Sequence, residues 1–393
     1  LPTADRALAV FIAKTAVRRA GEIDALLEHC LDQPPAAKAR DVLNVLRVGI
    51  AQLFYSNVAP HAAVSTSVDL CRDAGLEHMA KLVNAVLRRL SREGKPLLAG
   101  LDGPRINTPD WLWQSWAATY GADTARAIAT MHLEAPPLDL SAAGEPAQLA
   151  LAVGGQVMPG GAVRLANTEN VSELAGFADG GWWVQDMAAR LPANLLGPGE
   201  GRQVADLCAA PGGKTMQLAA AGWQVTAVDI SARRMARLAE NLTRTGLAAE
   251  VVVADVADWR PAQRFDAVLL DAPCSATGTL RRHPDVARLK NPADVGKLTG
   301  VQARLLAAAA NLVAEGGTLV YSVCSLEPEE GSDVITGFLN ARPEFRRDSV
   351  AVTDLPGLEL AITPAGDLRT LPSYLAQQGG MDGFFAARLT RQN

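Results

Sequence analysis

The chain of 393 residues is 49% apolar and 20% charged, with a formal net charge of -5 at pH 7. Its length predicts two or three domains, and its mild acidity argues against a protein that coats nucleic acid indiscriminately. It contains no uninterrupted apolar run of about 18 residues, so we expect neither a membrane span nor a membrane partner.

Helical periodicity dominates residues 1–105. Val42, Leu46 and Ile50 share one helical face, and a second amphipathic stretch runs from 63 to 90. Residues 94–104 are typical of a linker. We therefore expect an all-α domain at the start of the chain.

Residues 106–185 are less regular. Asn107-Thr108-Pro109-Asp110 predicts the start of a helix. Short apolar pieces predict strands at 138–140, 150–153 and 162–165. We expect a small α+β subdomain here that helps to close a site.

From residue 186 to 393, apolar strands alternate with helical segments, which predicts a doubly wound, Rossmann-like α/β domain. The expected strands are 204–207, 225–228, 251–253, 267–270 and 318–321. The carboxyl ends of strands in such a sheet line the ligand crevice. The residues that follow each strand are therefore the candidate site.

The first of these strands runs into a loop whose small residues and paired glycines let a ligand approach the backbone. A P-loop needs a glycine where Cys208 stands, and the G-x-G-x-x-G of a dinucleotide loop is absent. The remaining candidate cofactor is S-adenosyl-L-methionine, which methyl transfer would convert to S-adenosyl-L-homocysteine. Asp229 would accept hydrogen bonds from the ribose hydroxyls, and Asp255 would meet the adenine amine. The expected cofactor-binding set is Asp206, Cys208, Ala209, Ala210, Pro211, Gly212, Gly213, Lys214, Asp229, Asp255 and Asp271.

Two later strands each run into a turn that carries a cysteine, Cys274 in the first and Cys324 in the second. Neighbouring strand ends would bring both thiols to one site, which indicates chemistry that needs a soft nucleophile and a second thiol. The five cysteines form no CxxC pair, so we expect no disulfide framework and no bound metal. Unpaired thiols fit a reducing compartment, and we expect a cytoplasmic protein.

Together these segments resemble the RNA cytosine-5 methyltransferase family. The similarity spans most of residues 186–393 and rests on DLCAAPGGKT, VDIS, ADVADW, DAPCSATG, YSVCS and DGFF. The N-terminal helices resemble the NusB-like RNA-binding domain through RALAVFIA and KLVNAVLRRL. This combination implies the bacterial enzymes that methylate carbon 5 of one cytosine in 16S rRNA. Ala276 and Val323 depart from a usual Gly and Thr, and the Arg-x-Asn expected after Pro136-Pro137-Leu138 is missing.

The resemblance also implies the role of each catalytic residue. Cys324 would attack carbon 6 of the cytosine, and Cys274 would assist release. Asp271 would bind the base edge, and Lys214 would hold the target nucleotide. The base must be unstacked, so the expected partner is ribosomal RNA in a single-stranded or opened loop. We expect a monomer.

Four arginines are candidate RNA contacts. The alternative explanation is that they are ordinary solvent-exposed charges of the protein surface. They are Arg281 and Arg282, which follow the Cys274 turn, and Arg88 and Arg89 among the N-terminal helices.

Two other functions stay open. A DNA cytosine-5 methyltransferase would attack with Cys274, but the Glu-Asn-Val segment of those enzymes is absent. The second alternative is a non-catalytic, RNA-binding regulator. The presence of Asp206, Asp229, Asp271 and both cysteines argues against it.

Overall fold

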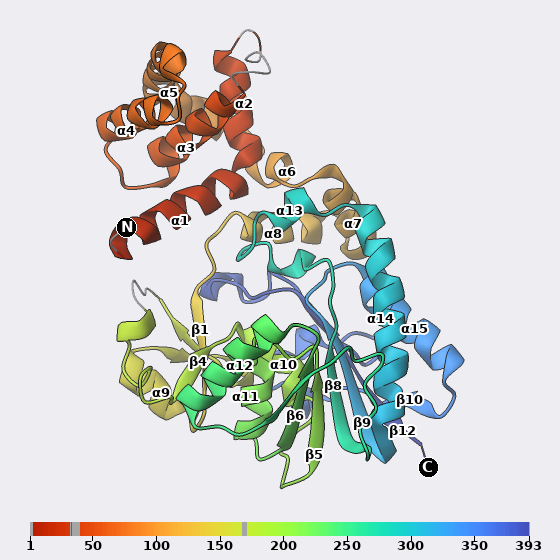
Figure 1. The fold of residues 1–393 in the computed structure, drawn as a ribbon. Coiled ribbons are helices and arrows are strands. Elements are labelled where there is room, and N and C mark those ends of the chain that lie inside the picture. Colours follow the sequence, from red (N-terminus) through yellow and green to blue (C-terminus); the bar gives the residue numbers. More distant parts are fainter. Residues whose placement is uncertain (1–2, 32, 34–39, 167–170, 393) are drawn as a thin grey trace. The chain divides into compact units, whose positions relative to one another are not determined.

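The computed structural model describes residues 3–31, 33, 40–166 and 171–392 (Figure 1). The chain divides into two compact units, one of residues 1–135 and 280–289 and the other of residues 136–279 and 290–393. The domain boundaries that we expected from the sequence, at residues 105 and 185, differ from the division between these two units. The expected boundaries stay a prediction. Residues 280–289 belong to the first unit, although they follow the Cys274 turn in sequence.

A large mixed sheet forms the centre of the second unit, with strand order β10-β12-β9-β8-β5-β6-β7 and with β11 paired to β12. The strands are β5 (Gln203–Leu207), β6 (Gln224–Asp229), β7 (Glu250–Val253), β8 (Phe265–Asp271), β9 (Val313–Val323), β10 (Phe345–Arg347), β11 (Leu368–Thr370) and β12 (Phe384–Arg391). Strands β5 to β9 pair in parallel, as predicted. The antiparallel pairing of β10, β11 and β9 with β12 was not predicted. The Rossmann-like fold class is confirmed.

Helices bury both faces of this sheet (Figure 1). They are α10 (Met187–Asn194), α11 (Gly213–Ala220), α12 (Ala232–Thr245), α14 (Pro292–Leu312) and α15 (Ser332–Ala341). Neighbouring residues of a strand point to opposite faces. In β8, Val268 and Leu270 therefore pack in one core with α14 and α15, while Ala267 and Leu269 pack in another with α10 and α11.

A smaller antiparallel sheet precedes this core, with strand order β2-β3-β1-β4. Its strands are β1 (Leu138–Ala142), β2 (Gln156–Val157), β3 (Val163–Leu165) and β4 (Trp182–Val184). The prediction of a strand at 150–153 is wrong, because these residues end helix α9 (Pro146–Val153), where Leu151 is 88% exposed. A short apolar run does not distinguish a strand from a helix, and Pro146 favours the first helical position.

The first unit is helical throughout its described part, which agrees with the all-α domain predicted for residues 1–105 and extends the helical region to His132. Its helices are α1 (Thr3–Arg18), α2 (Ala20–Cys30), α3 (Asp41–Tyr55), α4 (Pro60–Asp73), α5 (Ala80–Ala99), α6 (Gly103–Asn107), α7 (Asp110–Tyr120), α8 (Ala122–His132) and α13 (Val286–Leu289). Val42, Leu46 and Ile50 are fully buried. Across the described ranges, every helix is too short or too polar to span a bilayer.

The predicted linker begins too early, because α5 continues through Gly94 to Ala99. Gly94 is where α5 approaches α3, and a Cβ on it would lie 2.3 Å from the ring of Phe54. The glycine is therefore required for helix packing and does not mark a chain break.

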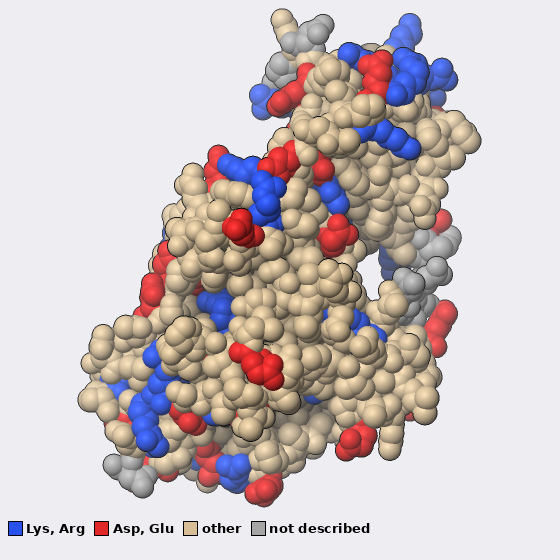
Figure 2. All heavy atoms as spheres, turned by 180° about the vertical axis from the view of Figure 1, so that it is seen from behind, with Lys and Arg blue, Asp and Glu red and all other residues tan. Residues whose placement is uncertain are grey.

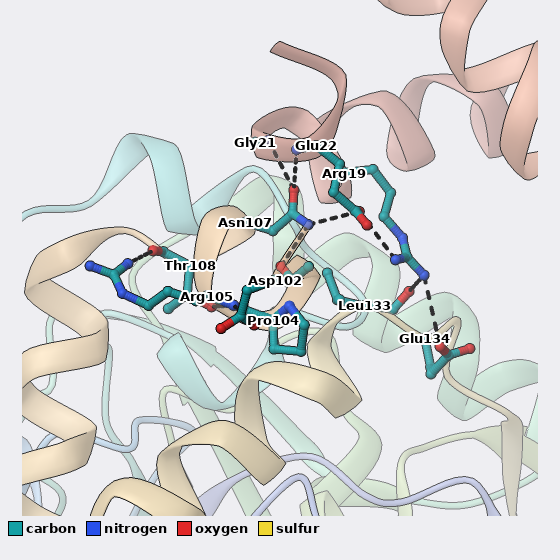
Figure 3. Close-up of polar contacts among 11 residues, drawn as sticks. Arg19, Gly21, Glu22, Asp102, Pro104, Arg105, Asn107, Thr108, Leu133 and Glu134 are labelled. Carbon is teal, nitrogen blue, oxygen red and sulfur yellow. Dashed lines mark hydrogen bonds and ion pairs between the residues drawn. The ribbon is translucent and has the colours of Figure 1, made fainter. Parts of the chain in front are cut away.

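Asn107, the last residue of α6, caps α2 from a distant part of the chain (Figure 3). Its Oδ1 accepts hydrogen bonds from the backbone N–H groups of Gly21 and Glu22, at 2.9 and 3.2 Å. Its Nδ2 donates to Glu22 Oε2 at 2.8 Å and to the carbonyl of Gly103 at 2.9 Å. Arg19, at the N-cap of α2, makes no capping hydrogen bond from its side chain. Asn107 thus satisfies amides that the start of a helix leaves unpaired.

We expect Asn107→Ala to destabilise the protein by about 2–4 kcal/mol, because two backbone amides lose their acceptor and buried Glu22 keeps Arg19 but loses the amide donor. Urea unfolding followed by circular dichroism measures this change. Asn44→Ala, at an exposed position of α3, is the control and should shift the free energy of unfolding by less than about 0.5 kcal/mol. Equal losses in the two variants would contradict the capping role.

Candidate active site

The parallel pairing of β8 with β9 brings the two cysteine turns together. Asp271 at the end of β8 is in register with Ser322 of β9, and the turns follow directly. The Sγ atoms of Cys274 and Cys324 lie 3.4 Å apart, and both cysteines are partly exposed. The prediction that neighbouring strand ends place two thiols side by side therefore matches the geometry.

Lys214 and Asp271 form an ion pair beside these turns. Lys214, in the first turn of α11, donates from Nζ to Asp271 Oδ2 at 2.8 Å. Ser322 Oγ donates to the other carboxylate oxygen, Oδ1, at 2.9 Å. The ammonium group also lies 5.1 Å from the centre of the Phe384 ring. These contacts fix the carboxylate of Asp271 while its side chain stays 33% exposed, so a ligand can still reach it.

The surroundings keep Cys274 protonated. Its pKa is raised well above the usual range of a thiol, first by the hydrogen bond with Cys324 and then by burial, with further contributions from the charges of Cys324 and Glu330. Cys208 in the cofactor loop is also a poor nucleophile, because burial raises its pKa to about 12. Of the three cysteines that follow a strand, the pair of Cys274 and Cys324 is thus the candidate for attack.

The loop between β5 and α11 is shaped by two residues with positive φ, Cys208 at 60° and Gly212 at 104°. A Cβ on Gly212 would lie 2.8 Å from Leu238 Cγ in α12, so glycine is required there on two grounds. The backbone N–H of Ala210 donates to Asp229 Oδ2 at 3.3 Å. The loop is therefore tied to the neighbouring strand β6, which ends at Asp229.

Three acidic residues lie at the carboxyl ends of the adjacent strands β5, β6 and β7. Asp206 is fully buried, and its Oδ1 has no hydrogen-bond partner in the described structure. Asp229 accepts from the N–H of Ser231 at 2.9 Å, and Asp255 from the N–H of Ala257 at 2.9 Å. Each of these last two carboxylates keeps further lone pairs for hydroxyl or amine donors. Together with the small residues of the loop, this set of acceptors fits a nucleoside such as S-adenosylmethionine.

Two residues of the site were missed in the sequence. Ser322 contacts Asp271 across the β8–β9 pair, and Phe384 reaches Lys214 from the antiparallel strand β12. The signal was present for Phe384, because it belongs to the DGFF segment. In the described ranges, no three His, Cys, Asp or Glu side chains are grouped so that they could hold a metal ion.

The predicted RNA contacts lie in the first unit and differ in exposure. Arg281 is fully buried, which corrects the expectation that its side chain contacts RNA at the surface. Arg282 and Arg89 are half-buried, and Arg89 pairs with Glu93 at 2.9 Å. Arg88 is exposed and lines a groove of about 540 Å³ between α4 and α5, together with Arg72 and Arg92. Figure 2 shows Lys and Arg side chains gathered on this part of the helical unit.

A Rossmann-like sheet with an acceptor-lined loop and paired thiols defines the class of the protein, an S-adenosylmethionine-dependent methyltransferase. Residues 193–390 match the family of 16S rRNA methyltransferase RsmB/F, and residues 1–92 match the NusB family. The chain belongs to the 16S rRNA methyltransferase RsmB/F family, as the resemblance of its motifs predicted.

Curated relatives agree with this assignment, and a solved structure shares the fold. The chain is 39% identical to the ribosomal RNA small subunit methyltransferase B of Pseudomonas putida, over 98% of this chain and 91% of that protein. It is 34% identical to the protein of the same name from Shewanella oneidensis, with the same shares of 98% and 91%. The crystal structure of PH0851 has a similar fold, with a TM-score of 0.79 and 23% identity over 97% of this chain and 89% of that one.

Burial raises the pKa of Asp206 to about 7, against a hydrogen bond from Thr215 that lowers it. Between about pH 4 and pH 7 the folded protein holds a proton that the unfolded chain releases, so the free energy of unfolding falls as pH rises through this range and is level above it. We therefore expect Asp206→Asn to stabilise the cofactor-free protein more at pH 8 than at pH 5. Urea unfolding of both proteins at the two pH values measures the difference.

The matched control is Asp258→Asn, at an exposed position after β7. Its stability should follow that of the wild type at both pH values. A gain from Asp206→Asn that is the same at pH 5 and pH 8 would show that Asp206 does not titrate in this range.

Proposed function

We propose that this chain methylates carbon 5 of a cytosine in 16S rRNA through a transient bond between Cys324 and carbon 6 of the base. The single observation that carries the proposal is the pair of thiols 3.4 Å apart beside the Lys214–Asp271 ion pair. The substrate is inferred from the names of the relatives, which are ribosomal RNA small subunit methyltransferases.

Carbon 5 of cytosine is a weak nucleophile, and a thiolate can activate it. The Cys324 Sγ adds to carbon 6, and the electron pair of the C5–C6 double bond becomes available at carbon 5. S-adenosylmethionine, held by the loop of residues 208–213 and by Asp229 and Asp255, supplies an electrophilic methyl group. Covalent catalysis thus divides one difficult substitution into easier steps.

Asp271 and Lys214 stabilise the charge that this addition creates. As the thiolate adds, N3 of the base takes up a proton from water, which neutralises the negative charge pushed into the ring. The carboxylate of Asp271 accepts a hydrogen bond from this N3–H until the proton returns to water on release. Lys214 keeps that carboxylate in place through its hydrogen bond of 2.8 Å. Because Lys214 is 8% exposed, its charge acts with little screening from water.

Release requires the loss of the proton on carbon 5 to water. The electrons of that C–H bond re-form the C5–C6 double bond, and the bond between Cys324 Sγ and carbon 6 breaks. Cys274, held as a thiol beside Cys324, donates a hydrogen bond to the departing sulfur and so makes it a better leaving group.

The first unit supplies the RNA surface in this proposal. Its groove between α4 and α5 is lined by Arg72, Arg88 and Arg92, whose guanidinium groups can pair with backbone phosphates. The target base must leave its stack to reach the thiols, which favours a single-stranded or opened loop. Free thiols throughout the chain fit the cytoplasm, and we propose that the enzyme acts there as a monomer.

The cysteine roles separate this proposal from a DNA-type mechanism, in which Cys274 would attack. We expect Cys324→Ser to lose at least about 10³-fold in methyl transfer and to form no RNA adduct. Cys274→Ser should instead accumulate a denaturant-resistant protein–RNA adduct. Transfer of labelled methyl groups to 16S rRNA and gel electrophoresis in denaturant measure both quantities. Adduct formation by Cys324→Ser would assign the attack to Cys274 and sink the proposal.

The groove makes a separate prediction about affinity. Replacing both Arg88 and Arg92 by Gln should raise KM for rRNA with little change in kcat, because these side chains meet phosphates and not the reacting base. The slope of log affinity against log salt should fall by roughly 0.7–0.9 for each phosphate that the variant no longer neutralises. Arg346→Gln, an exposed arginine of β10 in the other unit, is the control. An unchanged salt slope in the double variant would remove the groove from the RNA surface.

A further inference from the structure

Glu330 lies directly behind the two cysteine turns and takes no part in the mechanism described above. It ends a short 3-10 turn, Pro328–Glu330, that follows the Cys324 turn, and it is fully buried. Its carboxylate accepts hydrogen bonds from the Ser275 amide at 2.9 Å, from Gln302 Nε2 at 3.0 Å and from the Ser275 hydroxyl. All three donors are neutral. A buried carboxylate with neutral partners costs stability, so its presence beside the thiols calls for a functional explanation.

The carboxylate connects the two thiol-bearing turns. Ser275 follows Cys274 directly, and Ser325 follows Cys324 directly. The hydroxyls of these serines lie 3.1 Å apart, so a continuous hydrogen-bonded path runs from Glu330 through Ser275 to Ser325. Gln302 of α14 anchors the path from outside, since its Nε2 also donates to the carbonyl of Pro273 at 2.9 Å. Hydrogen bonds among groups other than the sulfurs therefore join the two thiol-bearing turns.

We propose that Glu330 is a positioning residue that holds Cys274 against Cys324 for the release step. The inference rests on the proposed function, because it assigns Glu330 to one half of that reaction. Cys274 is the thiol directly tied to the carboxylate, through both the amide and the hydroxyl of the next residue. Cys324 is reached only through the second serine. Loss of Glu330 should therefore disturb Cys274 first.

The electrostatic effect of Glu330 acts in the same direction. Its charge is one of the causes that raise the pKa of Cys274, after the hydrogen bond with Cys324 and burial. A negative group behind Cys274 favours its protonated form, and the proposed release step needs that form.

Glu330→Gln tests the inference with little change in volume. A carboxylate accepts at both oxygens, whereas an amide must donate from one atom. The Ser275 hydroxyl would then lose its acceptor, and the path to Ser325 would have to reverse. We expect turnover to fall by about tenfold or more, as small misplacements of reacting groups do, while the RNA adduct through Cys324 rises several-fold above wild type. The experiment uses the full chain with S-adenosylmethionine and unmethylated 16S rRNA transcript.

Glu329→Gln is the matched control, because Glu329 precedes Glu330 and is exposed. It should leave turnover and adduct unchanged. Ser275→Ala, which removes the hydroxyl link but keeps the carboxylate, should accumulate adduct to a smaller extent. If Glu330→Gln does not fold, Ser275→Ala decides the matter alone by the same two measurements.

Two outcomes would overturn the inference. One is wild-type turnover and adduct in folded Glu330→Gln. The other is a loss of turnover with no extra adduct, which would place Glu330 in general stability or in the first attack. Failure of the proposed function would give a different result, which does not depend on the behaviour of Glu330→Gln. In that case Cys274→Ser would form no adduct, or Cys324→Ser would keep its turnover.

Discussion

The parallel pairing of β8 with β9 is the constraint on which the site depends. Its register sets Asp271 opposite Ser322, and the chain leaves both strands in the same direction. The pairing of these two strands therefore brings the two cysteines together. A hydrophobic core on each face of the sheet holds these strands in place. Successive residues of each strand are buried in one core and then in the other. A shift of one residue in this register would turn one thiol away from the other.

Around the thiols the protein has assembled carboxylates whose environments differ. Asp271 is partly exposed and paired with Lys214, so it can meet a ligand. Asp206 is buried next to the cofactor loop, and its pKa is raised to about 7. Its carboxyl group is therefore mostly uncharged under mildly acidic conditions. Glu330 is buried among neutral donors behind the cysteine turns. The same type of group thus serves ligand contact, loop structure and positioning, and burial and partners decide which.

Sequence patterns could predict the parts of this site that follow directly from strand ends. Asp206, Asp229, Cys274 and Cys324 stand where apolar strands change to polar turns, so their shared location could be inferred. Phe384 could not be placed in this way, because it lies on the antiparallel strand β12. Local periodicity does not predict with which strand β12 pairs. Glu330 lies in the acidic segment Glu327-Pro328-Glu329-Glu330, and the sequence does not show that it is buried while Glu329 is exposed.

The errors have similar causes. Residues 150–153 are too few for periodicity to distinguish a helix from a strand. Gly94 suggested a chain break, but it is explained by the side chain of Phe54 on another helix. Arg281 was judged by its charge and its neighbours in sequence, whereas it is fully buried and its carbonyl accepts a hydrogen bond from Arg18 of α1. In each case the deciding contact is distant in sequence.

The membership of residues 280–289 in the first unit limits how this protein can be divided. Arg18 donates to the carbonyl of Arg281 at 2.7 Å, and Arg288 donates to that of Asn107 at 3.3 Å. A gene fragment that starts at residue 136 would encode both thiol turns. It would also encode residues 280–289, including buried Leu280, but not the helices of the first unit with which they pack. Excising the sheet unit alone needs a start at residue 136 and an internal deletion of residues 280–289, so a single truncation cannot isolate it.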